Sequence, residues 1–228
     1  MSQLTKLEIN GANIKTDGTA SFANLSELKS LTVYCLYGYY YDDEEVVLKL
    51  NESVNFFSRF KTLEEVEIMD CHLNDRVVES LVVNNPNLRN IYIDGWITYL
   101  NGRSLSTIAD NCPHLTHIGM GYQFVLQNDD IMQFFSKCSK LKYANFKATK
   151  IEDSALARLP CDCPDLETLD LSYCEEITEQ GIELFLDKAT QGKLKRLEIK
   201  GCEFLYDADY DTYLERLKQN YPNIDIIC

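Results

Sequence analysis

Aliphatic residues recur along the chain at the first, fourth and sixth positions of a short pattern, and in several copies a cysteine follows three residues later. The clearest copies are Leu166, Leu169, Leu171 with Cys174, and Leu194, Leu197, Ile199 with Cys202. Apolar residues at alternate positions predict a short strand with one buried face. The copies begin at Leu4, Leu28, Leu63, Leu88, Leu115, Leu141, Leu166, Leu194 and, in partial form, Ile224.

A second pattern precedes the strands at a fixed distance. The residue three positions before a copy is Asn85, Cys112, Cys138, Cys163 or Tyr221, and Pro follows all of these except Cys138. Apolar residues stand four and seven positions further back, and this spacing predicts one face of a helix. The Pro is expected to end that helix before the next strand begins.

The expected helices also share a beginning. An aliphatic residue is followed by a polar one that can cap a helix, namely Asn74, Asn101, Gln127, Glu152 and Thr178. Each unit therefore consists of strand, loop, helix and turn, and it buries its apolar faces only against its neighbours. The sequence predicts an α/β right-handed solenoid of about eight such repeats, with a parallel sheet on the concave face, forming a single domain over residues 1–228.

The segment from Cys163 to Ile182 resembles the cysteine-containing subclass of leucine-rich repeats that is typical of F-box/leucine-rich-repeat proteins. The resemblance extends over almost the whole chain and is clearest from Leu63 onward. It implies a horseshoe-shaped repeat domain. It also implies a role as the substrate-recognition part of a Skp–cullin–F-box ubiquitin ligase. The alternative is a leucine-rich-repeat scaffold or adaptor unrelated to ubiquitin.

No F-box segment is found in these residues, since the repeats begin at Leu4. A Skp-type adaptor is therefore expected to bind through a segment outside this chain. The client itself is expected to bind the repeats.

The chain is acidic: 22 Lys and Arg residues stand against 36 Asp and Glu residues, a formal charge of −14. Such a field attracts basic partners and repels nucleic acid and anionic lipid, so neither is expected to bind. The alternative is that the acidity only keeps the protein in solution. No run of about 18 apolar residues and no signal peptide is present, so a cytoplasmic location is expected, with the nucleus as the alternative.

The nine cysteines first suggest metal binding. Structural zinc needs four ligands in paired units, whereas the histidines are only His72, His114 and His117, and no two cysteines are separated by two residues. Most cysteines fall at two repeat phases, which favours buried free thiols in a reducing compartment. Asp207, Asp209 and Asp211 lack the later ligands of a calcium loop, and they are expected at the beginning of the last helix.

No metal, cofactor or catalytic site is therefore expected, and the chain is interpreted as a non-enzyme. A small-molecule sensor or hydrolase is the minority alternative. It would require a deep polar pocket on the concave face.

The candidate protein-binding residues flank the strand aliphatics or follow the strands, and they are acidic or aromatic. They are Tyr34, Glu65, Glu67, Met69, Tyr92, Asp94, Trp96 and Tyr122. Tyr and Trp often dominate interface energetics because they bury a large area and have few torsions to restrict. We expect this surface to bind a basic or amphipathic client segment. Two interpretations of the Tyr-rich insertion at 37–41 stand equally: it binds the client, or it packs against the edge of the solenoid.

Overall fold

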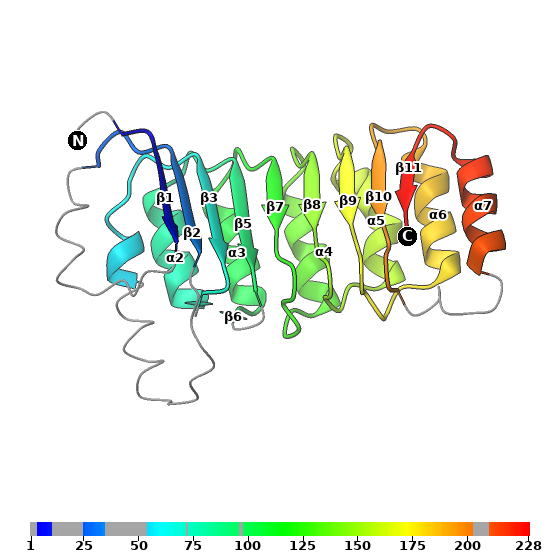
Figure 1. The fold of residues 1–228 in the computed structure, drawn as a ribbon, viewed down its shortest axis with the longest axis horizontal. Coiled ribbons are helices and arrows are strands. Elements are labelled where there is room, and N and C mark those ends of the chain that lie inside the picture. The colour runs from blue at the N-terminus through cyan, green and yellow to red at the C-terminus, as the bar shows by residue number, and fades with distance from the viewer. Residues whose placement is uncertain (1–3, 11–24, 35–53, 72, 96–97, 203–209) are drawn as a thin grey trace. The chain divides into compact units, whose positions relative to one another are not determined.

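The computed structural model describes residues 4–10, 25–34, 54–71, 73–95, 98–202 and 210–228. The chain forms two compact units, Met1–Leu115 and Thr116–Cys228. Each unit repeats the same arrangement, in which a strand is followed by a loop and a helix (Figure 1).

In the first unit, parallel strands lie side by side in the order in which they occur along the chain. They are β1 (Lys6–Asn10), β2 (Ser30–Tyr34), β3 (Glu65–Met69) and β5 (Asn90–Asp94). Helices α2 (Asp75–Asn84) and α3 (Gly102–Asn111) cover one face of this sheet, as Figure 1 shows. A short parallel pair, β4 (Leu73–Asn74) and β6 (Thr98–Tyr99), precedes these two helices.

The second unit follows the same order. Its parallel strands are β7 (His117–Gly119), β8 (Tyr143–Asn145), β9 (Thr168–Asp170), β10 (Arg196–Glu198) and β11 (Asp225–Ile227). Its helices are α4 (Asn128–Lys137), α5 (Asp153–Asp162), α6 (Glu179–Ala189) and α7 (Tyr210–Asn220).

The core lies between strands and helices, where the sequence pattern predicts it. In β3, Val66 and Ile68 are fully buried, whereas the residues that alternate with them are partly exposed. Burying one such side chain contributes about 1.5–3 kcal/mol, so the repeated pair stabilises every layer. The prediction of an α/β leucine-rich-repeat solenoid is confirmed.

The predicted helix beginnings are also confirmed. Asn74, Asn101, Gln127, Glu152 and Thr178 are the N-cap residues of α2 to α6. Asn74 accepts hydrogen bonds from the N–H groups of Arg76 and Val77. Because these N–H groups have no partner within the helix, the cap stabilises its first turn.

In the described loops, the chain bends after the strand through a residue with positive φ at the same repeat phase. In the second unit these residues are Tyr122, Ala148, Tyr173 and Gly201, with φ of 59°, 51°, 59° and 63°. This conformation is unfavourable for the residues other than glycine. The N–H group of Tyr122 donates to the backbone carbonyl of Lys147 at 2.8 Å, and that of Tyr173 to the backbone carbonyl of Lys200 at 2.7 Å. These hydrogen bonds help to hold the bend.

The buried cysteines connect consecutive repeats. The Cys174 thiol donates to the Phe146 carbonyl, and the Cys202 thiol donates to the Leu171 carbonyl, both at 3.2 Å. Burial raises the pKa of Cys174 to about 11 and that of Cys202 to about 12. These thiols are therefore packing groups, as the repeat phase predicts.

Buried free thiols were expected at the two repeat phases, and this prediction is wrong at Cys71, which is disulfide-bonded. The repeat phase predicts burial, but it does not determine whether two sulfur atoms lie within bonding distance. The other cysteines of the described residues are not in disulfides: Cys112, Cys138, Cys161, Cys163, Cys174, Cys202 and Cys228.

Candidate protein-binding face

Six of the predicted site residues lie on adjacent strands of the first unit. Parallel pairing places Tyr34 beside Met69, Met69 beside Asp94, and Glu67 beside Tyr92. Glu65 completes the group on β3, and all six side chains are partly exposed. They project from the sheet face opposite the aliphatic residues, because side chains alternate along a strand. We call these six residues, Tyr34, Glu65, Glu67, Met69, Tyr92 and Asp94, the acidic face.

Hydrogen bonds across the strands fix part of the acidic face. The Tyr34 hydroxyl donates to Glu67 Oε1 at 3.4 Å, and the Ser30 hydroxyl donates to Glu65 Oε2 at 3.2 Å. Each bond leaves the other carboxylate oxygen as a further acceptor. Positioned carboxylates of this kind can accept hydrogen bonds from Lys or Arg side chains.

The electrostatic potential at Tyr34 is negative. The pKa of Tyr34 is raised above its ordinary value, mainly by the charge of Glu67, with further contributions from partial burial and from Glu8. Negative charge from neighbouring carboxylates opposes ionisation of the phenol. The same potential attracts a cation.

Tyr122 belongs to the second unit, where it joins a group of aromatic rings. Its ring lies edge-on to Phe124, with centroids 6.3 Å apart. The Lys147 ammonium lies 5.0 Å from the Tyr122 ring centroid and 5.2 Å from that of Tyr173. Tyr173 is 49% exposed and Phe124 48%, so these rings present apolar surface.

Sequence reasoning did not assign Lys147 and Tyr173 to this group. Their signal was present, because Tyr122 and Tyr173 stand at the same phase of their repeats, directly after the strand pattern. The phase alone could not show that Lys147 lies between the two rings.

Three predictions fall wholly or partly outside the described residues. Trp96 and the Tyr-rich insertion at 37–41 lie there entirely. Asp207 and Asp209 also fall there, whereas Asp211 lies in the first turn of α7.

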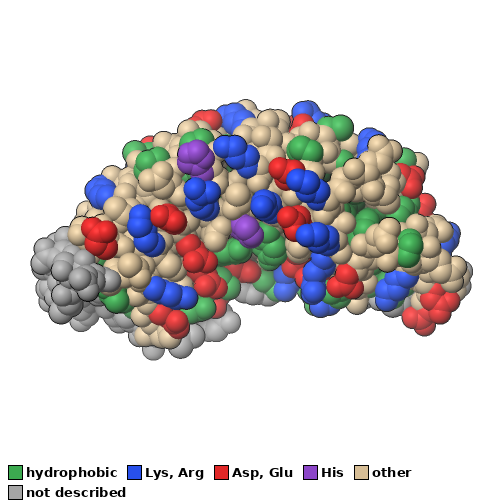
Figure 2. All heavy atoms as spheres, turned by 90° about the horizontal axis from the view of Figure 1, so that it is seen from above, with side chains coloured by type: hydrophobic (Ala, Val, Ile, Leu, Met, Phe, Trp, Pro, Cys, Tyr) green, Lys and Arg blue, Asp and Glu red, His purple; other side chains and the backbone are tan. Residues whose placement is uncertain are grey.

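In the described part of the chain, no group of three or more His, Cys, Asp or Glu residues could hold a metal ion. None of its helices is long and apolar enough to cross a membrane. The face seen from above in Figure 2 carries Lys and Arg side chains interspersed with Asp and Glu, so it has both signs of charge.

Comparison with known sequences agrees with the repeat pattern. A leucine-rich-repeat family model matches residues 162–186. The chain is 24% identical over 127 residues to a putative F-box protein of Arabidopsis thaliana, across 53% of this chain and 31% of that protein. It is 25% identical over 154 residues to F-box/LRR-repeat protein 4 of Bos taurus, across 54% of this chain and 25% of that protein. The aligned part thus covers less than a third of each relative.

Comparison with solved structures supports the fold. The chain is similar to a chain in the crystal structure of the yeast Rad7 and Elc1 complex, with a TM-score of 0.53 and 16% sequence identity. The similarity covers 99% of this chain and 69% of that chain. At this level of identity, the likeness concerns the arrangement of strands and helices.

Proposed function

Because this chain is a leucine-rich-repeat protein that resembles the repeat domains of F-box/LRR proteins, a kind of module that binds other proteins, we propose that its acidic face binds a protein client. The observation that supports the proposal most is the strand register, which sets Glu67 beside Tyr92 and Tyr34 beside Met69 on one open sheet face. The role is recognition without catalysis.

The composition of the acidic face defines the client segment. Tyr34, Met69 and Tyr92 offer apolar area, whereas Glu65, Glu67 and Asp94 offer negative charge. A client segment with Lys or Arg beside an apolar residue could contact both the apolar area and the negative charge. Charge complementarity would mainly steer the encounter and select the partner, and the rings would supply most of the affinity.

The Tyr34 and Glu67 side chains restrict each other through their hydrogen bond, and β2 and β3 pair beside them. Restricting a side chain before binding reduces the entropy lost on association. A regular strand face is thus a suitable platform for recognition.

We also propose that the bound client becomes ubiquitinated. The resemblance to F-box/LRR proteins supports a role as the client-binding part of a Skp–cullin–F-box ubiquitin ligase. The Skp-type adaptor would bind a segment other than these repeats. A fold alone does not determine such a role, so the proposed role in ubiquitination rests on the similarity to F-box/LRR proteins.

The test is affinity purification of the tagged chain, in its native reading frame, from its host with the proteasome inhibited. The proposal predicts that a Skp-type adaptor and a cullin co-purify with client proteins. Clients without an adaptor or cullin would contradict the ubiquitin part and favour a repeat scaffold. Recovery of clients by a Glu65→Lys/Glu67→Lys variant would contradict the acidic face as their binding site.

A further inference from the structure

Exposed apolar side chains gather at one edge of the second unit. Six large apolar residues are exposed in the described part of the chain, and three of them, Phe124, Val125 and Tyr173, belong to the loops after β7 and β9. Because β7, β8 and β9 are parallel neighbours, these loops leave the sheet at the same edge (Figure 1). We call Tyr122, Phe124, Val125 and Tyr173 the aromatic edge.

The backbone holds the two tyrosines of the aromatic edge in place. Besides the hydrogen bonds from the Tyr122 and Tyr173 N–H groups, the Ala148 N–H group donates to the Ser172 carbonyl at 2.8 Å. Lateral hydrogen bonds of the sheet thus continue into the loops. A Cβ atom at Gly201 would lie 2.5 Å from the Tyr173 ring, so this ring lies directly against the Gly201 backbone. Rings restricted in this way lose little entropy when a partner binds.

A cation lies against both tyrosine rings. The Lys147 ammonium is 5.0 Å from the Tyr122 ring centroid and 5.2 Å from that of Tyr173. Both distances are within the range of a cation–π interaction, in which the negative face of the ring attracts the charge. Lys147 follows β8, the strand that lies between β7 and β9 in the sheet. The chain's own lysine thus shows which kind of group these rings accommodate.

The charge around the aromatic edge favours a cationic partner. The helices that follow β7, β8 and β9 begin at this edge (Figure 1), and the loops before them contain the lysines Lys147 and Lys150. The N-caps and first turns of these helices carry five carboxylates, namely Asp129, Asp130, Glu152, Asp153 and Glu179. Negative charge beside exposed rings attracts Lys or Arg, and the rings offer apolar area to a neighbouring residue.

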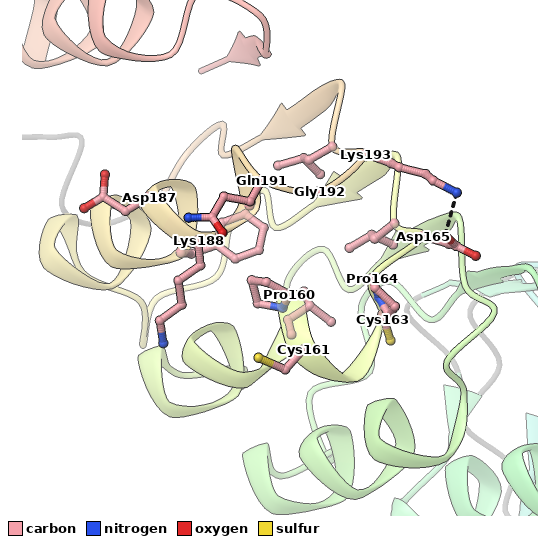
Figure 3. A pocket seen from close by; sticks show the side chains of 15 residues that line it. Pro160, Cys161, Cys163, Pro164, Asp165, Asp187, Lys188, Gln191, Gly192 and Lys193 are labelled. Carbon is pink, nitrogen blue, oxygen red and sulfur yellow. Dashed lines mark hydrogen bonds and ion pairs between the residues drawn. The ribbon is translucent and has the colours of Figure 1, made fainter.

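The pocket between the C-terminal ends of α5 and α6 has no such bias of charge (Figure 3). Its volume is about 750 Å³, and its lining includes Asp165 and Asp187 as well as Lys188 and Lys193. Lys193 contacts Asp165 at 2.7 Å. These charges select neither a basic nor an acidic partner, whereas those around the aromatic edge select a basic one.

We infer that the aromatic edge is a second protein-binding site, at which a Lys or Arg side chain of the partner takes the place of Lys147 against Tyr122 and Tyr173. An apolar residue next to that Lys or Arg packs against Phe124 and Val125. Lys147 competes with the partner for the rings. The aromatic edge lies within the second unit and shares no residue with the acidic face, so the inference does not depend on client binding there.

The test uses the full chain carrying Glu65→Lys/Glu67→Lys, which reverses two charges of the acidic face and so separates the two sites. Peptides are selected on this protein from a random 12-residue display library, and their binding is measured by fluorescence polarisation. The inference predicts enrichment of Lys or Arg next to Leu, Ile, Met or Phe. Selected peptides without enriched Lys or Arg would overturn it.

Removing the competing lysine should strengthen binding of a selected peptide. In Lys147→Met the affinity should rise about two- to fivefold, the factor expected for one exposed cation–π interaction. The control is Lys150→Met, which removes the same charge from an exposed residue of the same loop and should have a clearly smaller effect. Equal effects of the two changes would indicate only general charge attraction and would overturn the exchange at the rings.

Removing an aromatic face should have the opposite effect. Tyr173→Leu keeps an apolar side chain and should weaken binding about two- to fivefold, whereas Tyr173→Phe keeps the ring and should leave the affinity nearly unchanged. If Tyr173→Leu does not fold, the two lysine variants still decide. Unchanged affinity in a folded Tyr173→Leu would overturn the inference. A dimer that is lost in Tyr173→Leu would assign the aromatic edge to a second copy and would also overturn it.

Discussion

The Asp153 carboxylate accepts two hydrogen bonds from Thr178 of the following repeat, one from its N–H group at 2.9 Å and one from its hydroxyl at 2.7 Å. The Thr178 hydroxyl oxygen in turn accepts from the Gly181 N–H group at 3.1 Å. The first turn of α5 thus positions the cap of α6. Asp75 and Asn101 form the same kind of link in the first unit, at 3.1 Å.

Replacing Asp153 with Ala should destabilise the second unit. Both bonds to Thr178 are lost, and the α6 cap is no longer held, so the free energy of unfolding should fall by about 1–2 kcal/mol. Urea unfolding followed by circular dichroism measures the change. The exposed carboxylate Glu176, changed to Ala, is the control and should cause little change. Equal stability of the two variants would show that the link is unimportant.

Replacing Gly181 with Ala should destabilise the protein for a steric reason. A Cβ atom at this position would lie 1.8 Å from Asp153 Oδ1, so the carboxylate would have to move. On helix propensity alone, the change should instead stabilise by about 0.5–1 kcal/mol. A double-mutant cycle decides between the two: in an Asp153→Ala background, Gly181→Ala should become neutral or stabilising. Simple additivity of the two changes would contradict the proposed clash.

The strands and helix beginnings could be predicted because each depends on nearby residues. Leu169 and Leu171 mark a strand by their alternation, and Thr178 marks a helix beginning by its place after Ile177. The link from Asp153 to Thr178 could not be predicted in this way. It joins two repeats, and it depends on helix positions that only the three-dimensional packing sets.

The candidate site shows the same limit. The strand pattern was sufficient to group Tyr34, Glu67 and Tyr92 on one face, since register follows from the repeat. The pocket lined by Phe185, Ala189 and Gln191 could not be predicted, because it depends on how α5 and α6 pack against each other. The left-handed conformation of Tyr173 was also not apparent, because tyrosine gives no local signal for it.

Replacing Glu67 with Gln should lower the pKa of Tyr34 towards its ordinary value of 10.0. The charge of Glu67 is the largest cause of the increase, and Gln keeps a hydrogen-bond acceptor while removing that charge. An NMR titration with ¹³C-labelled tyrosine, assigned with Tyr34→Phe, measures the shift. An unchanged Tyr34 pKa would contradict the negative potential ascribed to this face.

The cysteines should differ sharply in reactivity at pH 8. Cys161 is exposed and should be alkylated rapidly by iodoacetamide, because the thiolate is the reactive form and the reagent can reach it. Burial raises the pKa of Cys112 and Cys202 to about 12, so these thiols stay protonated until the pH approaches that value. Mass spectrometry of timed digests checks the order. Early alkylation of Cys202 in the folded protein would contradict the packing role of that thiol.

Binding of the client at the acidic face can be tested by quantitative co-purification. The tagged chain is compared with Glu65→Lys/Glu67→Lys and with Glu175→Lys/Glu176→Lys, an exposed pair in the second unit, with all three proteins shown to be folded. We predict that the same set of partners is lost from the first variant and retained by the second. Retention of every partner by Glu65→Lys/Glu67→Lys would contradict the claim.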